Sequence, residues 1–203
     1  MDPLLTTLAR PFRSLPPDIL TAIALFFAVA AGALFYLATP QQEPTNYLLL
    51  FAAFAITLNG LFDAIDGKVA KLTHQQTARG DFLDHALDRY ADVFIIGGLA
   101  LNPLWCRPSI GLLAIIGVLL TSYMGTQAQA VGCQRDYSGL LGRADRIALL
   151  ITFPIIQHAF IITNATLPYG LTVLEIAMII FAIVGNITAL QRFFGTLRWF
   201  NKK

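Results

Sequence analysis

The stretch NGLFDAIDGKVAKLTHQQTARGDFLDHALDRYAD, residues 59–92, holds six of the twelve acidic residues in the chain. The sequence around it is of another kind: 56% of the 203 residues are hydrophobic and only 13% are charged. A soluble domain carries about a quarter charged residues. Because charge is costly in apolar surroundings, carboxylates gathered in such a chain indicate a functional site.

Four long stretches of the chain contain no charged residue. They are residues 19–42, 44–62, 108–134 and 147–174, and about 20 apolar residues suffice for a helix to cross the hydrocarbon core of a bilayer. The sequence therefore predicts a single all-α integral membrane domain over residues 1–203. We expect a bundle of six transmembrane helices within residues 17–203, at 17–39, 46–71, 81–104, 109–131, 144–164 and 170–194.

The first 16 residues precede the first expected span. Their large apolar side chains would share one helical face: Leu4, Leu5, Leu8 and Phe12. The two arginines of this segment would lie outside that face. This pattern is typical of a short helix lying at the membrane surface, so we predict an interfacial helix within residues 1–16, with a frayed terminus as the alternative.

Lysine and arginine are distributed unevenly about the predicted spans. With six spans both termini lie on one side, and thirteen of the fourteen Lys and Arg residues fall there; only Arg107 lies opposite. The positive-inside rule makes the basic side cytoplasmic. We therefore expect a multi-pass protein of the cell membrane whose termini and acidic stretch face the cytoplasm.

Four aspartates of the acidic stretch fit two helical stripes. Residues three or four apart share a helical face, which pairs Asp63 with Asp66 on one helix and Asp84 with Asp88 on the next. Each aspartate alone could be a solvated helix cap, but four converging carboxylates would repel one another unless cations bound them. Two Mg²⁺ or Mn²⁺ ions would balance their charge, because hard cations prefer oxygen ligands.

A glycine and a lysine accompany the first pair of aspartates. Gly67 removes a side chain where a ligand has to approach the backbone closely, and Lys71 follows one turn later with a positive charge. Metal ions beside a small-residue notch and a basic residue are typical of a pyrophosphate-binding site.

The complete spacing is D-x2-D-G-x2-A-K-x8-G-x3-D-x3-D, formed by Asp63, Asp66, Gly67, Ala70, Lys71, Gly80, Asp84 and Asp88. It closely resembles the signature of the CDP-alcohol phosphotransferase (CDP-alcohol phosphatidyltransferase) family. The six-helix length and topology also match, so the resemblance covers essentially the whole chain. Two departures are Lys71, where the family has Arg and its bidentate fork, and Asp18, which replaces the Asn of the family's P-N-x-x-T.

The resemblance implies a membrane phospholipid synthase that transfers a phosphatidyl or archaetidyl group from a CDP-linked lipid to an alcohol and releases CMP. It implies that Asp88 is the general base. It further implies a two-metal site of Asp63, Asp66, Asp84 and Asp88, and a CDP site of Asp66, Gly67, Ala70, Lys71, Gly80 and Asp81. A homodimer through the third and fourth spans is likewise what the family suggests, and no nucleic-acid partner is expected.

Arginines flank the predicted cytoplasmic mouth of the bundle: Arg135, Arg143, Arg146 and Arg192. Arginine favours phosphate, although anchoring to lipid headgroups is the alternative for any one of them. Arg146 and Arg192 are the strongest candidates, because each begins or ends a span. An acceptor that already carries a phosphate, such as inositol phosphate or glycerol phosphate, would use such a pocket.

Two segments relate the chain to the branch of the family that uses inositol phosphate. GRADR, residues 142–146, is similar to the E-R-x-E-R element of that branch. SYMGTQAQAVG, residues 122–132, resembles its S-Y-x-K-A-R-A-E-x2-G segment, but Gly125 and Gln127 occupy the places of the basic residues. We therefore favour inositol phosphate as the acceptor, with glycerol phosphate as the alternative.

Two other classes of membrane protein are weaker alternatives. An intramembrane aromatic prenyltransferase also binds a diphosphate through Asp-rich helices and Mg²⁺, but its two motifs lie in different halves of a longer chain. A divalent-cation transporter would explain intramembrane aspartates, but it predicts polar residues through to the far side. The fourth and fifth expected spans offer few of these.

Overall fold

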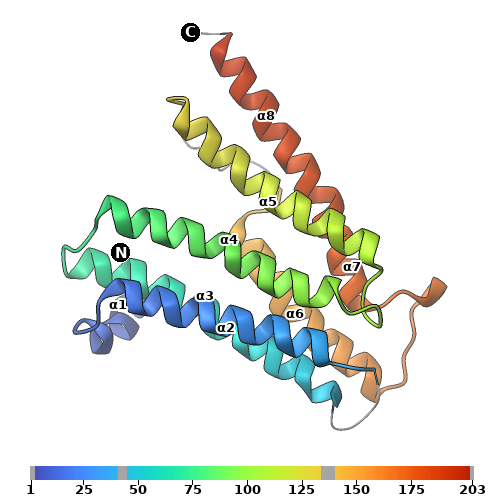
Figure 1. Ribbon diagram of the computed structural model, residues 1–203. Helices are drawn as coiled ribbons and strands as arrows, with labels where there is room; N and C mark the ends of the chain where they lie inside the picture. The colour runs from blue at the N-terminus through green and yellow to red at the C-terminus, as the bar shows by residue number, and fades with distance from the viewer. Residues whose placement is uncertain (1–2, 41–44, 134–139, 202–203) are drawn as a thin grey trace.

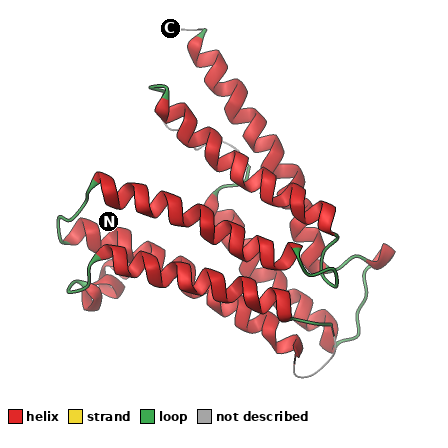
Figure 2. Ribbon diagram, in the orientation of Figure 1, coloured by secondary structure: helices red, strands yellow, loops and turns green. Residues whose placement is uncertain are grey.

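The computed structural model describes residues 3–40, 45–133 and 140–201, which form helices and their connections (Figures 1 and 2). Six long helical rods follow a short N-terminal helix. The elements are α1 (Pro3–Ala9), η1 (Arg10–Phe12), α2 (Pro17–Leu37), η2 (Thr45–Tyr47), α3 (Leu48–Leu72), α4 (Ala78–Ala100), α5 (Pro108–Ala130), α6 (Arg143–Ile162), η3 (Pro168–Gly170), α7 (Val173–Ile180), η4 (Phe181–Gly185) and α8 (Asn186–Phe200).

The predicted all-helical membrane architecture is confirmed. Among the described residues, five helical segments are long and apolar enough to cross a membrane: α2, α3, α5, α6 and the continuous run from Val173 to Phe200. The third expected span corresponds to α4, whose first fifteen residues include six charged ones. The count of six spans therefore stays a prediction, although this is a multi-pass membrane protein.

Two of the expected span boundaries are wrong. The third span was expected to end at residue 104, but α4 ends at Ala100, because Asn102 leaves the helix to cap neighbouring backbone groups. The sixth was expected to end at residue 194, but its helix continues to Phe200. This extension projects beyond the other helices beside α5 (Figure 1), and it contains a charged residue, Arg198, beyond the apolar stretch.

The N-terminal helix is real but shorter than expected. Helix α1 ends at Ala9 and continues as a single 3₁₀ turn to Phe12. Its predicted apolar face is divided: Leu5 and Phe12 pack against a cluster formed with Ile65 and Val69 of α3, whereas Leu4 stays 73% exposed. One part of the face thus docks on the protein, and the other is free to enter a membrane surface.

Glycines set how closely the rods approach. Gly32 of α2 lies against the Phe94 carbonyl of α4, and a Cβ on Gly98 would collide with the Gly32 backbone. Between α5 and the last rod, Gly117 and Gly185 meet in the same way. Small residues are the usual means of close helix contact in membranes, and these four glycines permit it within the single chain.

The last rod contains a π-helical segment, η4, at its centre. The Gly185 carbonyl there accepts a hydrogen bond from Thr121 Oγ1 of α5 at 2.8 Å. A π segment shifts the register of the residues that follow it, and such segments are frequent at functional sites. The shift sets which face α8 turns toward α5.

The ends of the rods opposite the acidic stretch are joined by a network of hydrogen bonds centred on Asn102. Its Nδ2 donates to the Phe35, Tyr36 and Ala38 carbonyls at 2.8–3.0 Å. Trp105 Nε1 also donates to Ala38 at 2.9 Å. We call this end of the molecule the Asn102 end. The opposite end, which carries the acidic residues within 63–92, is called the acidic end.

Candidate active site

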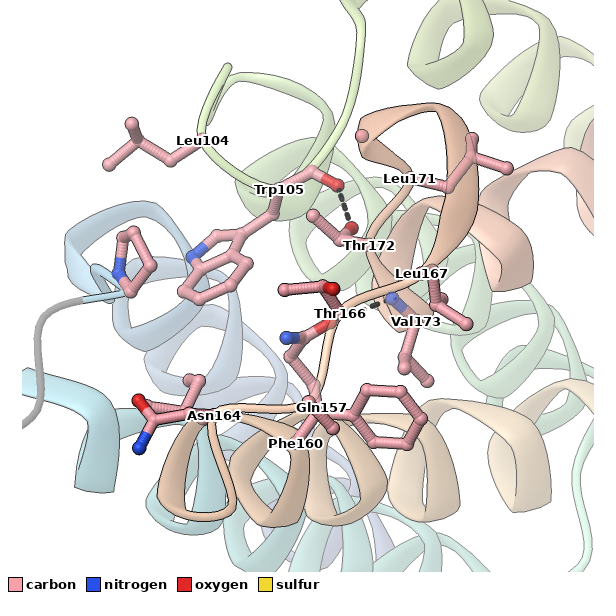
Figure 3. A pocket seen from close by; sticks show the side chains of 14 residues that line it. Leu104, Trp105, Gln157, Phe160, Asn164, Thr166, Leu167, Leu171, Thr172 and Val173 are labelled. Carbon is pink, nitrogen blue, oxygen red and sulfur yellow. Dashed lines mark hydrogen bonds between the residues drawn. The ribbon is translucent and has the colours of Figure 1, made fainter.

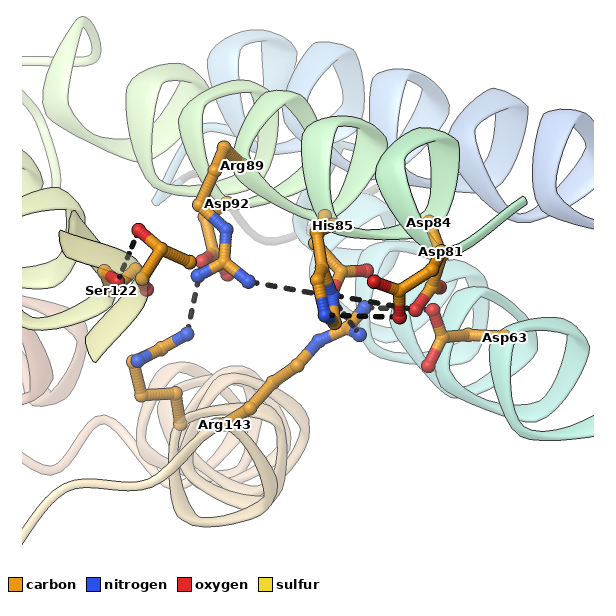
Figure 4. Close-up of polar contacts among 11 residues, drawn as sticks. Asp63, Asp81, Asp84, His85, Arg89, Asp92, Ser122 and Arg143 are labelled. Atoms are coloured by element: carbon orange, nitrogen blue, oxygen red, sulfur yellow. Dashed lines mark hydrogen bonds and ion pairs between the residues drawn. The ribbon is translucent and has the colours of Figure 1, made fainter. Parts of the chain in front are cut away.

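The predicted aspartates come together at the acidic end. Carboxylate oxygens of Asp63, Asp66 and Asp84 lie within 4.8 Å of one another, and Asp84 also groups with His85 and Asp88 within the same limit. All four predicted metal ligands therefore lie in one cluster, with Asp84 common to both groups. Figure 4 shows Asp63 of α3 facing Asp84 of α4.

The turn between α3 and α4 produces this arrangement. His74 adopts a left-handed conformation with φ 56°, which ends α3 while the Gln75 N–H bonds the Ala70 carbonyl at 2.9 Å. Thr77 then caps α4 by accepting from the Gly80 N–H at 3.0 Å. The chain reverses within a few residues, so the stripe from α3 faces the stripe from α4.

The cluster suits divalent metal ions. Its donors are carboxylate oxygens, the ligands that Mg²⁺ and Mn²⁺ prefer. Asp66 is only 4% exposed, and its Oδ2 is buried without a hydrogen-bond partner among the described residues. A buried carboxylate oxygen of this kind requires a cation or another donor, so the residues present fit the predicted ions.

A cavity of about 480 Å³ opens on one side of the cluster. Its lining includes all six predicted CDP-site residues: Asp66, Gly67, Ala70, Lys71, Gly80 and Asp81. A Cβ on Gly67 would meet nothing within 4 Å, so this glycine leaves open space beside the carboxylates. Asp18, the departure noted in the sequence, also lines the cavity and pairs with Arg79 at 3.3 Å.

A second cavity of about 280 Å³ lies on the other side of the cluster, between α4, α5, α6 and α8. Asp84 lines both cavities. Three of the predicted phosphate-binding arginines converge on the second one: Arg143, Arg146 and Arg192. The fourth, Arg135, lies outside the described residues.

Two of these arginines are too buried to be headgroup anchors. Arg146 is 2% exposed and pairs with Asp92 at 3.0 Å. Arg192 is 8% exposed, and its Nη1 donates to the Thr121 carbonyl at 2.7 Å. Burying a guanidinium is expensive unless it is paired or serves a ligand, so their position favours binding of an anion in the cavity.

Arg143 takes a different position from the one expected. Its guanidinium bridges the two helices of the aspartate cluster, with Nη2 at 3.0 Å from Asp63 and Nη1 at 2.5 Å from Asp88 (Figure 4). It lines the second cavity as well. Arg143 therefore links the aspartate cluster to the second cavity, which we call the arginine-lined cavity.

Three polar side chains of the second cavity were not predicted to belong to the site: His85, Arg89 and Ser122. Arg89 lies 3.4 Å from Asp88. A signal for two of them was present, because Asp84, Asp88 and Asp92 continue at a spacing of four and His85 and Arg89 follow the first two directly. Ser122 comes from α5, and its approach depends on how the rods cross.

A third cavity, of about 380 Å³, lies at the Asn102 end between the ends of α4, α6 and α7 (Figure 3). Trp105, Gln157 and Thr172 line it. The polar groups of this wall bond one another: Thr172 Oγ1 donates to the Trp105 carbonyl at 2.6 Å, and Gln157 Oε1 accepts from the Val173 N–H at 2.7 Å. No predicted site residue lies here.

Comparison with known proteins decides between the candidate classes. A family model described as CDP-alcohol phosphatidyltransferase matches residues 14–182. The chain belongs to the CDP-alcohol phosphatidyltransferase family. It is a phospholipid-synthesising membrane transferase that uses divalent metal ions, and the prenyltransferase and transporter alternatives are set aside.

Two relatives in this family match most of the chain. Archaetidylinositol phosphate synthase from Methanothermobacter thermautotrophicus is 29% identical over 179 residues, 88% of this chain and 82% of that protein. Phosphatidylinositol phosphate synthase from Streptomyces avermitilis is 30% identical over 189 residues, 89% of this chain and 71% of that protein.

The fold also matches a solved member of the CDP-alcohol phosphatidyltransferase family. Phosphatidylinositol phosphate synthase from Mycobacterium tuberculosis, with CDP-DAG bound, superposes with a TM-score of 0.74 over 95% of this chain and 92% of that chain at 24% identity. A second structure of that synthase, in complex with manganese and citrate, gives a TM-score of 0.75.

Proposed function

We propose that this enzyme transfers a phosphatidyl or archaetidyl group from a CDP-linked lipid to a hydroxyl of inositol phosphate and releases CMP. The observation that carries the proposal is the pair of cavities that meet at Asp84, one lined by the CDP motif and the other by buried arginines. Donor and phosphorylated acceptor would then reach the same carboxylates from opposite sides. The names of the relatives support the same acceptor.

The cavity lined by the CDP motif, which we call the donor cavity, would hold the CMP half of the CDP-lipid. The open space at Gly67 lets the nucleotide approach the α3 backbone, and Lys71 supplies a point charge to the diphosphate. Asp63, Asp66, Asp84 and Asp88 would hold two Mg²⁺ or Mn²⁺ ions. When bound, these ions would neutralise the diphosphate and stabilise the departing CMP.

Asp88 would be the general base. It is 6% exposed and lines the arginine-lined cavity, which we also call the acceptor cavity. Its carboxylate can therefore take the proton of an acceptor hydroxyl held there. The hydroxyl oxygen attacks the lipid-side phosphorus, the bond from that phosphorus to the bridging oxygen of CMP breaks, and CMP leaves with the bonding electrons. Exclusion of water by the buried cavity favours the alcohol over hydrolysis.

Arg146 and Arg192 would bind the phosphate of the acceptor, with Arg143 and Arg135 as further partners. Buried arginines recognise a phosphate through charge-assisted hydrogen bonds, but they do not by themselves distinguish an inositol ring from a glycerol chain. Gly125 and Gln127 lack the bases found elsewhere in the branch. Glycerol phosphate is therefore the second candidate acceptor.

The same proposal includes the orientation and assembly of the enzyme. Its basic side, with the acidic end and both termini, would face the cytoplasm. A homodimer would use the exposed apolar face of α4, where Gly97 has open space and Tyr90, Phe94 and Leu101 are exposed at helical spacing. Cross-linking in native membranes tests the dimer, since a Gly97→Leu variant should lose the dimer if this face forms it.

A panel of acceptors tests the proposed reaction. Purified enzyme with Mn²⁺ should release CMP from CDP-diacylglycerol or CDP-archaeol when inositol phosphate is added, and much more slowly with serine or free inositol. Product from glycerol phosphate alone would select the second candidate. Product from serine or free inositol alone would overturn the assignment of the arginine-lined cavity.

A further inference from the structure

Arg143 occupies a singular position between the two halves of the site. It is the first residue of α6, and its guanidinium contacts Asp63 of α3 and Asp88 of α4 at the same time. Both carboxylates belong to the proposed metal site. The same side chain lines the arginine-lined cavity proposed for the acceptor phosphate.

The contacts make Arg143 and the metal ions competitors. A guanidinium nitrogen at hydrogen-bond distance takes up lone pairs of the carboxylates that a divalent ion would also need. Two ions would supply four positive charges to four carboxylates. A guanidinium kept within 3 Å of the same oxygens would then add a fifth positive charge. The repulsion between this charge and the metal ions is strong in a partly buried region.

We propose that Arg143 and the divalent ions are alternative partners of Asp63 and Asp88, and that metal binding transfers Arg143 to the acceptor phosphate. The inference rests on the proposed function. It makes Arg143 a residue that sets the order of binding: the acceptor is held fully only after the metal ions are in place.

The order has a chemical use. An acceptor that bound before the metal ions would occupy the site beside carboxylates that cannot yet hold the diphosphate of the donor. While Arg143 bridges Asp63 and Asp88, its charge is compensated by these two carboxylates, although the side chain lines the arginine-lined cavity. The affinity of this cavity for the acceptor is therefore reduced until the carboxylates have changed partners.

Arg146 is a natural control for this inference. It lies one turn further along α6 and carries the same charge, but it pairs with Asp92, which is outside the metal cluster. Metal binding gives Arg146 no reason to move. A comparison of Arg143→Gln with Arg146→Gln therefore separates competition for the metal ligands from the loss of a positive charge near the site.

The first experiment measures Mn²⁺ binding to the full-length enzyme in detergent, without lipid donor or acceptor, by electron paramagnetic resonance of free Mn²⁺. Arg143→Gln should lower the Kd for Mn²⁺ by about tenfold, within the range usual for coupled sites. Arg146→Gln should change it much less. Unchanged or weaker Mn²⁺ binding in Arg143→Gln would overturn the proposal.

The second experiment measures thermal unfolding with and without saturating Mn²⁺. Arg143→Gln should lower the midpoint without metal, because Asp63 and Asp88 lose the cation that they share, and the deficit should vanish with metal. Arg146→Gln should lower it equally in both conditions. A deficit in Arg143→Gln that persists with Mn²⁺ would show that Arg143 stays on the carboxylates, and the inference would fail. Arg143→Lys provides a second variant should the glutamine variant not fold, with the same trend expected at smaller amplitude.

The third experiment measures inositol phosphate binding by equilibrium dialysis. Mn²⁺ should strengthen binding of inositol phosphate severalfold in wild type. Arg146→Gln should bind it more weakly with and without Mn²⁺ but show the same gain. Arg143→Gln should lose the gain. A full gain in Arg143→Gln would contradict the transfer step. If wild type binds no inositol phosphate at all, the acceptor assignment fails, while the Mn²⁺ and unfolding results still decide whether Arg143 competes with metal.

Discussion

The two ends of α4 carry polar clusters of opposite character. At the Asn102 end, one amide donates to three carbonyls, and the buried Glu175 receives two guanidinium nitrogens and the backbone N–H of Arg107 at 2.9–3.2 Å. At the acidic end, four carboxylates share a small volume with one bridging arginine.

The difference shows how a structural polar cluster is distinguished from a functional one. The Asn102 amide and the Glu175 carboxylate both have matched partners, so these two groups stabilise the fold by themselves. At the acidic end, like charges lie together and the Asp66 Oδ2 remains without a partner among the described residues. The acidic end therefore needs ligands to complete it, and the folded state bears a cost for keeping it ready to bind.

The largest effect should come from the acidic end. Asp88→Asn removes the proposed base while keeping its shape, and we expect kcat for CMP release to fall by about 10²–10⁴-fold. Rates measured in detergent with Mn²⁺ and saturating inositol phosphate check this. Asp145→Asn, an exposed aspartate at the start of α6 outside both cavities, is the matched control and should keep near-normal activity.

A mutation at the Asn102 end should have the opposite result. Asn102→Ala removes this donor from the Phe35 and Tyr36 carbonyls and leaves the Ala38 carbonyl with Trp105 Nε1, and we expect a loss of roughly 2–4 kcal/mol in unfolding free energy. The kcat of the remaining folded enzyme should stay within about twofold of wild type. Thermal melting beside activity per folded molecule checks both, with Asn201→Ala at the exposed end of α8 as control. A selective loss of kcat without a change in melting would reverse the comparison.

A smaller effect should follow from the link between the two regions along α5. Thr121→Val removes the hydroxyl that holds the Gly185 carbonyl of the π segment, and it loosens the register that presents Arg192. We expect the acceptor KM to rise about fivefold, near 1 kcal/mol, with the donor KM unchanged. Thr152→Val on α6, where an exposed hydroxyl bonds its own helix, should change neither. A rise in the donor KM alone would contradict this positioning role.

The smallest effect concerns the departure at Lys71. Lys71→Arg restores the bidentate fork that is usual in the family, and we expect the KM for the CDP-lipid to fall by about twofold to threefold at equal kcat. Lys68→Arg, on the same helix but outside the donor cavity, should leave this KM unchanged. A higher donor KM in Lys71→Arg would show that the cavity is shaped around the lysine.

The sequence predicted the acidic end better than the Asn102 end. The sequence predicted two helical stripes of aspartates, because charged residues contrast with an apolar background and recur at helical intervals. These are Asp63, Asp66, Asp84 and Asp88. Asn102 and Glu175 stand alone in the sequence, and nothing near them indicates partners more than 60 residues away. Long-range pairing of single polar residues has no local pattern.

The positions of the arginines could be predicted from the sequence only in part. Their number and their predicted cytoplasmic side come from the sequence, and Arg146 and Arg192 line the arginine-lined cavity. The position of Arg143 on the metal-site carboxylates was not predicted, because a flexible side chain at a helix start can reach several partners. Which partner it meets depends on where α6 lies relative to α3 and α4.

The sequence by itself determined the membrane class, the helical stripes and the chemistry of the site, because hydrophobic length and helical spacing are local properties of the chain. Only the tertiary structure decided that Asp84 lines two cavities, that Asp92 holds Arg146, and that Arg143 bridges the cluster. Those relations depend on the crossing of rods, which close contacts such as Gly32 with Gly98 and Gly117 with Gly185 set across distant parts of the chain.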